Sequence, residues 1–336
     1  MFTYQAISSL ENKNKGIAKM NEEWIVSEEF YGQLQEILTK EQILQNEPLS
    51  RHTTFRIGGP ATFLLIPRSK EEIIACVTLC TQMQIPFYIL GNGSNILASD
   101  KGYHGVIIKV AEEFSLVQIE EENTEASEKK YIVTAMSGVL LSTLSKKIAA
   151  HGLTGFEFAE GIPGTLGGAV TMNAGAYDGE IKDCIVSATV IDREGNVLHL
   201  NKEELNLGYR KSVVQEQSYI VLEAVFEFVK GNQADIDAKM QDLKQRRKDK
   251  QPLEYPSAGS TFKRPVGYFA GKLIMDSELR GYTVGGAMIS EKHCGFVINK
   301  GGATGADVRT LINHVIDTVE KNFGVRLETE VKFLGE

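Results

Sequence analysis

The first third of the chain shows apolar runs that alternate with polar, helix-like segments. The run ATFLLIP (61–67) predicts a strand, and Ser69 followed by Glu72 predicts the capped start of a helix whose apolar positions recur at helical spacing. The run IPFYIL (85–90) predicts a second strand that leads directly into the loop GNGSN, and GVIIKV (105–110) predicts a third. We therefore expect a β-α-β unit in which one strand ends at a glycine-containing loop.

The middle of the chain predicts a second group of strands, which begins after a polar, acidic stretch (111–130) that we interpret as a domain seam. Its expected elements are a strand, a helix that stops at Gly152, a hairpin that turns at 194–196 and a further strand. Between the helix and the hairpin lies the longest glycine-rich segment of the chain. The first strand spans 131–138, the helix 139–152, the hairpin 185–200 and the further strand 219–229, and the glycine-rich segment spans 158–177.

The last third predicts helices at 234–250, 269–277 and 306–324 and strands at 295–299 and 325–334. The helix ending at Gly324 has the clearest amphipathic pattern. Residues 1–19 are polar and read as an extension, and a helix is expected to start after Met20. No period of 20 to 50 residues repeats, so the pattern predicts an α+β protein rather than a repeat array.

Composition narrows the class of protein. The 336 residues are 42% hydrophobic and 24% charged, with a formal net charge of -8. An acidic balance argues against nucleic acid as the main partner. No apolar run approaches the roughly 18 residues of a membrane span, and four cysteines are scattered without metal-type spacing. We expect a cytoplasmic protein with no membrane insertion, no disulfide and no metal site.

Two glycine-rich loops are the candidates for ligand binding. GNGSN (91–95) offers consecutive backbone N–H groups for an anion, but it lacks the lysine of a P-loop and does not open a helix as a Rossmann fingerprint does. GIPGTLGGAVTMNAGA (161–176) has few large side chains, which suits close approach to a flat ligand such as a flavin. Tight turns and helix-on-sheet packing are the alternative interpretations.

Six motifs, in one order, carry a family resemblance: GNGSNIL, EGIPGTLGGAVTMNAGAY, LGYRKS, SAGSTFKRP, AGKLI and LETEVKF. The chain from Leu49 onward resembles the UDP-N-acetylenolpyruvoylglucosamine reductases, flavoenzymes of peptidoglycan synthesis. The short link between Val229 and Ala234 leaves no room for the insertion that carries a substrate-closing tyrosine in one branch of the family. The chain therefore resembles the branch without that insertion.

The resemblance implies a two-subdomain FAD-binding module of the vanillyl-alcohol-oxidase or PCMH type and a C-terminal α+β substrate-binding domain. The implied divisions are 1–48 as an N-terminal extension with helices, 49–110 and 111–230 as the FAD-binding subdomains, 231–325 as the substrate-binding domain and 326–336 as a strand with a catalytic glutamate. Neither glycine-rich loop contains a histidine, so we expect FAD to be non-covalent. The residues implied for FAD are Asn92, Gly93, Ser94, Asn95, Gly161, Ile162, Pro163, Gly164, Thr165, Gly168 and Ala169.

The implied reaction is the NADPH-dependent reduction of UDP-N-acetylglucosamine enolpyruvate to UDP-N-acetylmuramate. The resemblance assigns the substrate carboxylate to Arg210, the proton for C2 to Ser260 and support of the enolate to Glu330, with Glu328 as a rival on the same strand face. Contacts to the substrate or NADPH are expected from Arg247, Lys250, Lys263, Arg264 and His293. We expect a monomer.

Two alternatives stay open at this point. The first is another FAD-dependent oxidase or dehydrogenase of the same fold, which would leave the Arg210, Ser260 and Glu330 set unexplained. The second is a nucleotide-binding protein without catalytic activity. A hydrolase is not favoured, because AGSTF is not a G-x-S-x-G motif.

Overall fold

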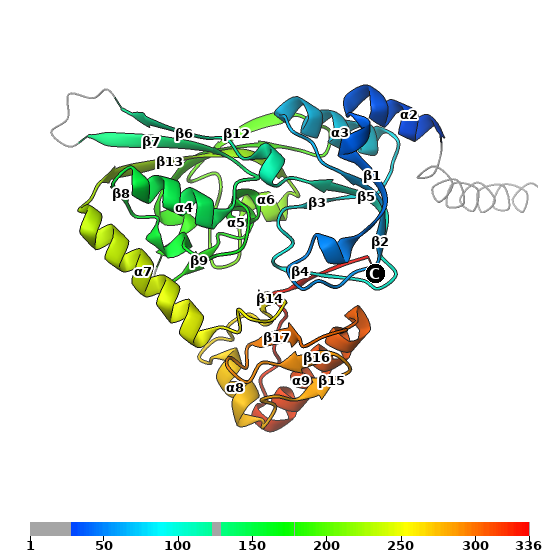
Figure 1. Ribbon diagram of the computed structural model, residues 1–336, viewed down its shortest axis with the longest axis vertical. Helices are drawn as coiled ribbons and strands as arrows, with labels where there is room; N and C mark the ends of the chain where they lie inside the picture. Colours follow the sequence, from blue (N-terminus) through cyan, green and yellow to red (C-terminus); the bar gives the residue numbers. More distant parts are fainter. Residues whose placement is uncertain (1–27, 123–128, 178, 336) are drawn as a thin grey trace, which may run out of the picture.

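The computed structural model describes residues 28–122, 129–177 and 179–335. The described chain forms three bodies, each with its own sheet and hydrophobic core (Figure 1). The expected helix start near Met20 lies largely outside the described residues, and the first described helix is α2 (Glu28–Ile37). No helix among the described residues is both long enough and apolar enough to cross a membrane.

The first body is a four-stranded sheet in the order β1-β2-β5-β3. Strand β1 is antiparallel to β2, whereas β2, β5 and β3 are parallel to one another, as the expected β-α-β unit requires. The Ser69 hydroxyl accepts the Glu72 N–H, which confirms the expected cap of α3. The strands are β1 (Ile43–Pro48), β2 (Pro60–Leu65), β3 (Phe87–Leu90) and β5 (Tyr103–Lys109), and α3 spans Lys70–Gln82.

The second body is an antiparallel sheet in the order β12-β11-β13-β7-β6, with β8 paired to β13. The acidic segment that we interpreted as a domain seam follows the last strand of the first sheet and contributes β6, which pairs with β7 as the edge strand of the second sheet. The strands are β6 (Val117–Glu121), β7 (Lys130–Met136), β8 (Leu153–Thr154), β11 (Ile185–Ile191), β12 (Val197–Asn201) and β13 (Ile220–Lys230).

Three short helices and the glycine-rich segment pack against this second sheet (Figure 1). Phe156 lies at the centre of their core, with edge-on contacts to Phe158, Phe226 and Phe228. These elements are α4 (Leu141–Ala150), α5 (Leu166–Thr171) and α6 (Val213–Glu216), and the strand pair β9 (Gly175–Ala176) and β10 (Gly179–Glu180) follows α5. The 3-10 turns among the described residues are η1 (Lys40–Gln42), η2 (Leu49–Arg51), η3 (Glu112–Phe114), η4 (Glu157–Ala159) and η5 (Ile181–Asp183).

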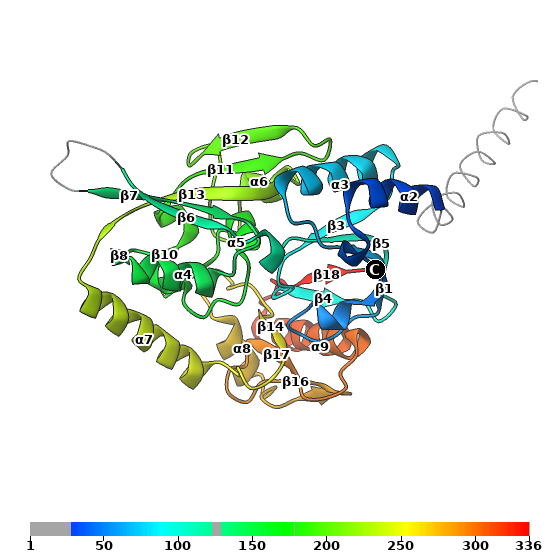
Figure 2. The ribbon, with the colours of Figure 1, turned by 45° about the horizontal axis from the view of Figure 1, so that its top comes forward.

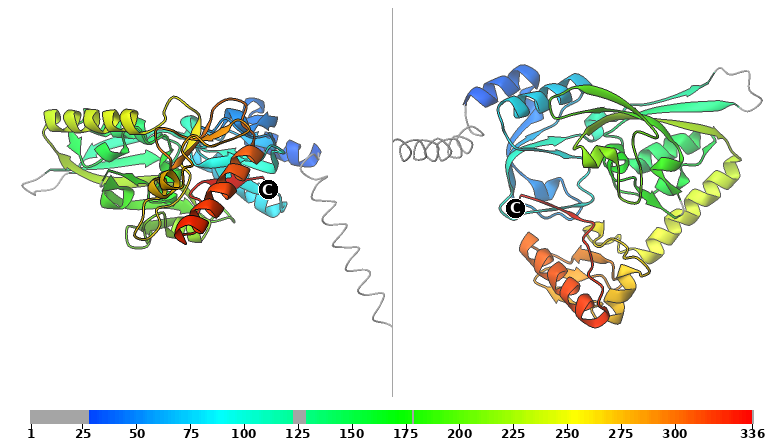
Figure 3. Two further views of the ribbon diagram at one scale, coloured as in Figure 1. Left: turned by 90° about the horizontal axis from the view of Figure 1, so that it is seen from below. Right: turned by 180° about the vertical axis from the view of Figure 1, so that it is seen from behind.

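The third body is reached by helix α7 (Gln233–Lys250), which runs from the second body to the third (Figures 1 and 3). It combines a four-stranded sheet, in the order β14-β17-β16-β15, with α8 and α9. Helix α9 begins with a capping box between Thr304 and Asp307 and ends at Gly324, whose φ of 67° is left-handed. The bounds are β14 (Ser257–Ser260), α8 (Ala270–Asp276), β15 (Thr283–Val284), β16 (Ala287–Ile289), β17 (Phe296–Asn299) and α9 (Gly305–Phe323).

The C-terminal segment leaves the third body and returns to the first. We expected one strand over 325–334, but only β18 (Lys332–Leu334) is a strand, because it pairs in parallel with β4 (Ile96–Ala98) beside the first glycine-containing loop (Figure 2). A second connection joins the same two bodies: the Asp100 carboxylate accepts the N–H groups of Gly305 and Ala306 at 2.7 and 3.0 Å. The pairing of β18 with β4 and the contacts of Asp100 with the start of α9 therefore both hold the third body against the first.

Candidate active site at the junction of the three bodies

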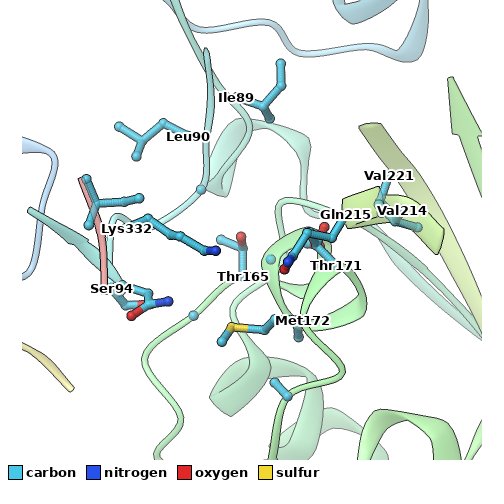
Figure 4. A pocket seen from close by; sticks show the side chains of 18 of the residues that line it. Ile89, Leu90, Ser94, Thr165, Thr171, Met172, Val214, Gln215, Val221 and Lys332 are labelled. Atoms are coloured by element: carbon cyan, nitrogen blue, oxygen red, sulfur yellow. The ribbon is translucent and has the colours of Figure 1, made fainter. Parts of the chain in front are cut away.

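A cleft of about 540 Å³ lies where the three bodies meet. The first body lines it with β3 and the loop after it, the second with residues of the glycine-rich segment and α6, and the third body and the C-terminal segment with Lys263, Glu330 and Lys332. Figure 4 shows Ser94 and Lys332 on one side of this space and Thr171, Met172 and Gln215 on the other. The cleft is elongated along β3, since residues from Phe87 to Ile96 all line it.

The loop after β3 is built for an anion. Among the described residues, no hydrogen bond is donated by the backbone N–H groups of Asn92, Gly93, Ser94 or Asn95. Gly93 has a left-handed φ of 61°, and a Cβ there would lie 2.2 Å from the carbonyl oxygen of His52. Glycine is thus required for the loop to turn and to approach the neighbouring chain. Four free N–H groups in a turn form a concave anion-binding nest.

The two glycine-rich loops touch each other across the cleft. The Asn92 side chain donates to the carbonyl of Pro163 at 2.6 Å. A Cβ on Gly91 would lie 2.2 Å from the hydroxyl oxygen of Thr165, so only glycine permits this approach. Gly168, in contrast, has no heavy atom within 4 Å of its Cβ position and lines the cleft. The loops therefore support each other while one of their glycines leaves open space for a ligand.

An orphaned hydroxyl supports the fit of a polar cofactor. Ser137 follows β7, lines the cleft and is 1% exposed, yet its Oγ has no hydrogen-bond partner. A buried hydroxyl without a partner costs free energy. A flavin cofactor carries carbonyl, ring-nitrogen and hydroxyl groups that could pair with this hydroxyl, so the residues present fit FAD.

Most of the residues that the resemblance assigns to FAD line the cleft: Asn92, Gly93, Ser94, Asn95, Ile162, Gly164, Thr165, Gly168 and Ala169. Gly161 and Pro163 are not among the lining residues. Gly161 has a φ of 75° and packs on Arg247, whose Cδ would lie 2.9 Å from a Cβ at that position. The cleft lining therefore does not support the expectation that Gly161 and Pro163 touch the cofactor.

Arg210 and Glu330 meet at one end of the cleft. The Arg210 Nε donates to Oε1 of Glu330 at 2.7 Å, and the two side chains are 23% and 11% exposed. Arg210 has a left-handed φ of 54°, and its guanidinium lies 5.4 Å from the ring centre of Tyr209. The residues are 120 positions apart, so their pairing depends on the return of the C-terminal segment. The site brings a cation and a carboxylate together beside the proposed cofactor space.

Ser260 lies next to this pair without lining the cleft. It is the exposed last residue of β14, and its neighbour Thr261 accepts the backbone N–H of Glu330 at 2.8 Å. The residue directly after Ser260 is therefore hydrogen-bonded to the segment that carries Glu330. The Ser260 hydroxyl makes no hydrogen bond to the part of the protein that the structure describes.

The structure separates Glu330 from its rival Glu328. Glu330 lines the cleft, whereas Glu328 does not and its side chain is 74% exposed. Oε2 of Glu328 pairs with Nζ of Lys263 at 2.9 Å, and this lysine holds the pKa of the Glu328 carboxyl below its ordinary value. The two carboxylates therefore have different partners, and Glu330 is the one that faces the cleft.

The residues expected to contact the substrate are spread out. Lys263 lines the cleft, whereas Arg247, Lys250, Arg264 and His293 do not. Arg264 stacks on Phe269 at 4.0 Å, and Nδ1 of His293 accepts the Gly295 N–H at 3.1 Å. Burial lowers the pKa of His293.

Arg247 is the unusual member of this set. It is 7% exposed, its Nε and Nη2 have no hydrogen-bond partner, and burial lowers the pKa of its guanidinium. Its guanidinium lies 5.4 Å from the ring centre of Tyr177. A buried guanidinium with free donors is costly unless a ligand pairs with it. Arg247 therefore remains a candidate for an anionic group of the substrate.

Glu157 anchors α7 beside the glycine-rich segment. Its carboxylate accepts from the Thr154 hydroxyl at 2.7 Å and from the Gly155 N–H at 3.1 Å, and it pairs with Lys239 of α7 at 3.2 Å. Burial acts to raise the pKa of the Glu157 carboxyl, but these hydrogen bonds outweigh burial and leave the pKa below its ordinary value. The carboxylate therefore joins α7 to the second body.

Several cleft residues were missed by the sequence reasoning, among them Ser137, Arg193, Gln215 and Lys332. For Lys332 a signal existed: it lies two residues after Glu330 and thus on the same side of an extended segment. Arg193, on the β11–β12 turn, stacks on Phe87 at 4.9 Å. This contact joins the second body to the first, and no local pattern reports it.

Comparison with known proteins gives a consistent result. Residues 251–334 match the family model "UDP-N-acetylenolpyruvoylglucosamine reductase, C-terminal domain", and residues 60–201 match "FAD binding domain". The chain is 56% identical to the UDP-N-acetylenolpyruvoylglucosamine reductase of Lachnoclostridium phytofermentans, over 90% of this chain and 96% of that protein. It is 53% identical to that of Clostridium perfringens strain SM101, over 91% and 98%. The solved structure of the Thermus caldophilus enzyme aligns with a TM-score of 0.71 and 33% identity, over 87% of this chain and 98% of that one.

Proposed function

The chain belongs to the UDP-N-acetylenolpyruvoylglucosamine reductase family, and from this membership we propose its reaction and the residues that perform it. It is an FAD-dependent oxidoreductase of peptidoglycan precursor synthesis. The proposed reaction is the reduction of UDP-N-acetylglucosamine enolpyruvate to UDP-N-acetylmuramate with NADPH as reductant. The observation that carries the residue assignment is the Arg210–Glu330 pair at the end of a cleft with an anion-binding loop.

The cofactor is held by the two glycine-rich loops in this proposal. The free N–H groups of Asn92 to Asn95 bind its diphosphate, and Gly164, Thr165, Gly168 and Ala169 lie along it. When bound, FAD supplies the hydride chemistry, taking a hydride from NADPH and giving one to C3 of the enolpyruvyl group. The chain's own residues bind and orient the substrate and supply the proton.

Arg210 is the proposed ligand of the substrate carboxylate, because a guanidinium binds a carboxylate with two parallel hydrogen bonds. In this structure its partner is Glu330. The substrate carboxylate therefore competes with Glu330 for the same cation. Release of Glu330 toward the reacting carbons would then follow from substrate binding itself.

Ser260 is the proposed donor of the proton to C2. The carbon–carbon double bond becomes a single bond when C3 gains a hydride and C2 gains the serine proton, and the negative charge of the enolate is discharged in the second step. A hydroxyl is a weak acid near neutral pH, so this role requires cations nearby. Lys263, three residues later, lines the cleft and is the proposed cation; in this structure it pairs with Glu328 at 2.9 Å.

Substrate phosphate groups are the proposed ligands of Arg247, Lys250, Lys263 and Arg264, with His293 near the nucleotide. The support is strongest for Arg247, whose buried donors have no partner, and for Lys263, which lines the cleft. We also propose that the active form is the monomer.

The test is an anaerobic assay of NADPH oxidation by the FAD-loaded protein. With UDP-N-acetylglucosamine enolpyruvate present, we expect one NADPH to be consumed for each UDP-N-acetylmuramate formed, as measured by mass spectrometry. If the rate of NADPH consumption does not depend on this substrate but requires added oxygen, the protein would instead be an oxidase of the same fold. A protein that binds no flavin would refute the proposal altogether.

A further inference from the structure

Lys332 is a cleft residue to which the proposed reaction assigns no role. It begins β18, where its backbone N–H donates to the carbonyl of Asn95 at 2.9 Å and it pairs with Ile96. Its side chain lines the cleft, and Figure 4 shows it extending from the C-terminal strand toward Thr165. The lysine is therefore held directly beside the loop of free N–H groups.

Lys332 differs from two of the other cations of the cleft in having no carboxylate partner in the described part of the chain. Four cations line the space: Arg193, Arg210, Lys263 and Lys332. Arg210 pairs with Glu330 and Lys263 pairs with Glu328. For Lys332 and Arg193, no carboxylate partner exists within residues 28–122, 129–177 and 179–335. Two cations thus face the cleft with their charge uncompensated.

Position separates these two cations. Arg193 stacks on Phe87, at the start of the four-residue strand β3, whereas the loop of free N–H groups follows its end. At about 3.3 Å per residue the two ends are roughly 10 Å apart. Lys332 alone of the pair is bonded to the loop itself. Only Lys332 is therefore placed to act together with the N–H groups of Asn92 to Asn95.

We propose that Lys332 is the counter-ion of the FAD diphosphate at this loop. Phosphate sites commonly combine a nest of backbone N–H groups with a lysine that acts as a point charge. The loop GNGSN has no lysine of its own, and the C-terminal strand supplies one from more than 200 residues later. The inference rests on FAD being the cofactor of the proposed function.

A consequence follows for the catalytic segment. Glu330 lies two residues before Lys332, and the Asn95 side chain donates to the Glu330 carbonyl at 3.1 Å. A diphosphate bound by both the loop and Lys332 would clamp β18 against β4 and so fix the backbone that carries Glu330. Lys332 is thus a positioning residue: cofactor binding and the placement of Glu330 are coupled through it.

The first test compares two flavins on the stripped, full-length chain. In Lys332→Met we expect the Kd of FAD to rise about tenfold or more, equivalent to about 1.4 kcal/mol, and to depend less on salt than in the wild type. The Kd of riboflavin, which has no phosphate, should stay unchanged. Lys332→Arg, which keeps the charge, should bind FAD within about threefold of the wild type, and Lys101→Met is the matched control, since Lys101 is exposed and outside the cleft.

The second test follows the strand itself by hydrogen exchange. FAD should slow exchange of the amides of β18 in the wild type and do so much less in Lys332→Met. The proposal is overturned if Lys332→Met binds FAD as the wild type does, if it loses FAD and riboflavin affinity equally, or if FAD protects β18 to the same extent in both proteins. A wild-type chain that binds no FAD would contradict the proposed function instead, which keeps the two failures distinct.

Discussion

Breaking the Arg210–Glu330 pair is expected to cost stability as well as activity. The pair is a charge-assisted hydrogen bond of 2.7 Å between side chains that are 23% and 11% exposed. Such bonds contribute about 1.5–3 kcal/mol, part of which is offset by desolvation of the two ions. We expect a coupling energy of about 1–2 kcal/mol between the two residues. It should appear as a difference in the free energy of unfolding.

A double-mutant cycle with Arg210→Gln, Glu330→Gln and the double variant measures this coupling by urea unfolding of the apoprotein. Lys211→Gln is a suitable control, because Lys211 is exposed and pairs separately with Glu216 at 3.0 Å. A coupling energy below about 0.3 kcal/mol would refute the reasoning, since it would make the contact no more than a surface ion pair.

The same variants separate the two roles of Arg210. In calorimetric titrations with the enolpyruvyl substrate, Arg210→Gln should weaken binding about tenfold to a hundredfold, because a charge-assisted carboxylate contact is lost. Glu330→Gln should not weaken binding, since Glu330 competes with the substrate for Arg210. Equal weakening by both substitutions would contradict this competition.

Three further predictions concern the cleft and its support. Gly93→Ala should lower the free energy of unfolding by about 1–3 kcal/mol and weaken FAD binding, because its Cβ would meet His52 at 2.2 Å; Gly259→Ala, with a similar φ of 72° and open space around it, controls for backbone strain alone in the same urea titrations. Ser137→Ala should leave the apoprotein at least as stable as the wild type but raise the Kd of FAD about fivefold, as measured by flavin fluorescence, since its orphaned hydroxyl gains a partner only in the complex. In Glu157→Gln, the loss of unfolding free energy relative to the wild type should be constant above about pH 5 and shrink below about pH 4. A carboxyl whose pKa is lowered by folding contributes stability above its unfolded pKa of about 4.3, and this contribution is lost as the pH falls through the folded pKa. A difference in unfolding free energy that stays the same at every pH would contradict this.

Local patterns in the sequence were sufficient to predict most of the helices and strands that the structure shows. The cap at Ser69 and the stop at Gly324 appear as expected, because capping depends on residues a few positions apart. The acidic segment before β7 lies between the strands of the first sheet and those of the second, but its strand β6 was not predicted, since an edge strand with one solvated face resembles a linker in composition. A strand was expected over 325–334, but only its last residues form one, because pairing with β4 rather than local propensity decides where the strand begins.

The site shows the same division between local and long-range information. The loop at 91–95 could be identified as an anion site from its residues, because the N–H groups that form it are consecutive in sequence. The roles of Arg210 and Glu330 depended on family resemblance, and their contact joins residues 120 positions apart. Ser137 enters the cleft through burial that no sequence window contains, whereas the place of Lys332 on the same side as Glu330 follows from their spacing of two residues.

The most direct test of the proposed chemistry is the effect of Ser260→Ala on the two half-reactions, followed anaerobically by stopped-flow absorbance of the flavin. We expect reduction by NADPH to stay within about twofold of the wild type and reoxidation by the enolpyruvyl substrate to slow by about 10²- to 10⁴-fold, the usual contribution of a positioned proton donor. Ser257→Ala, on the same strand β14, should leave both rates near those of the wild type. Equal loss of both half-reactions in Ser260→Ala would show that the serine supports the fold or the cofactor rather than donating the proton, and would contradict the account.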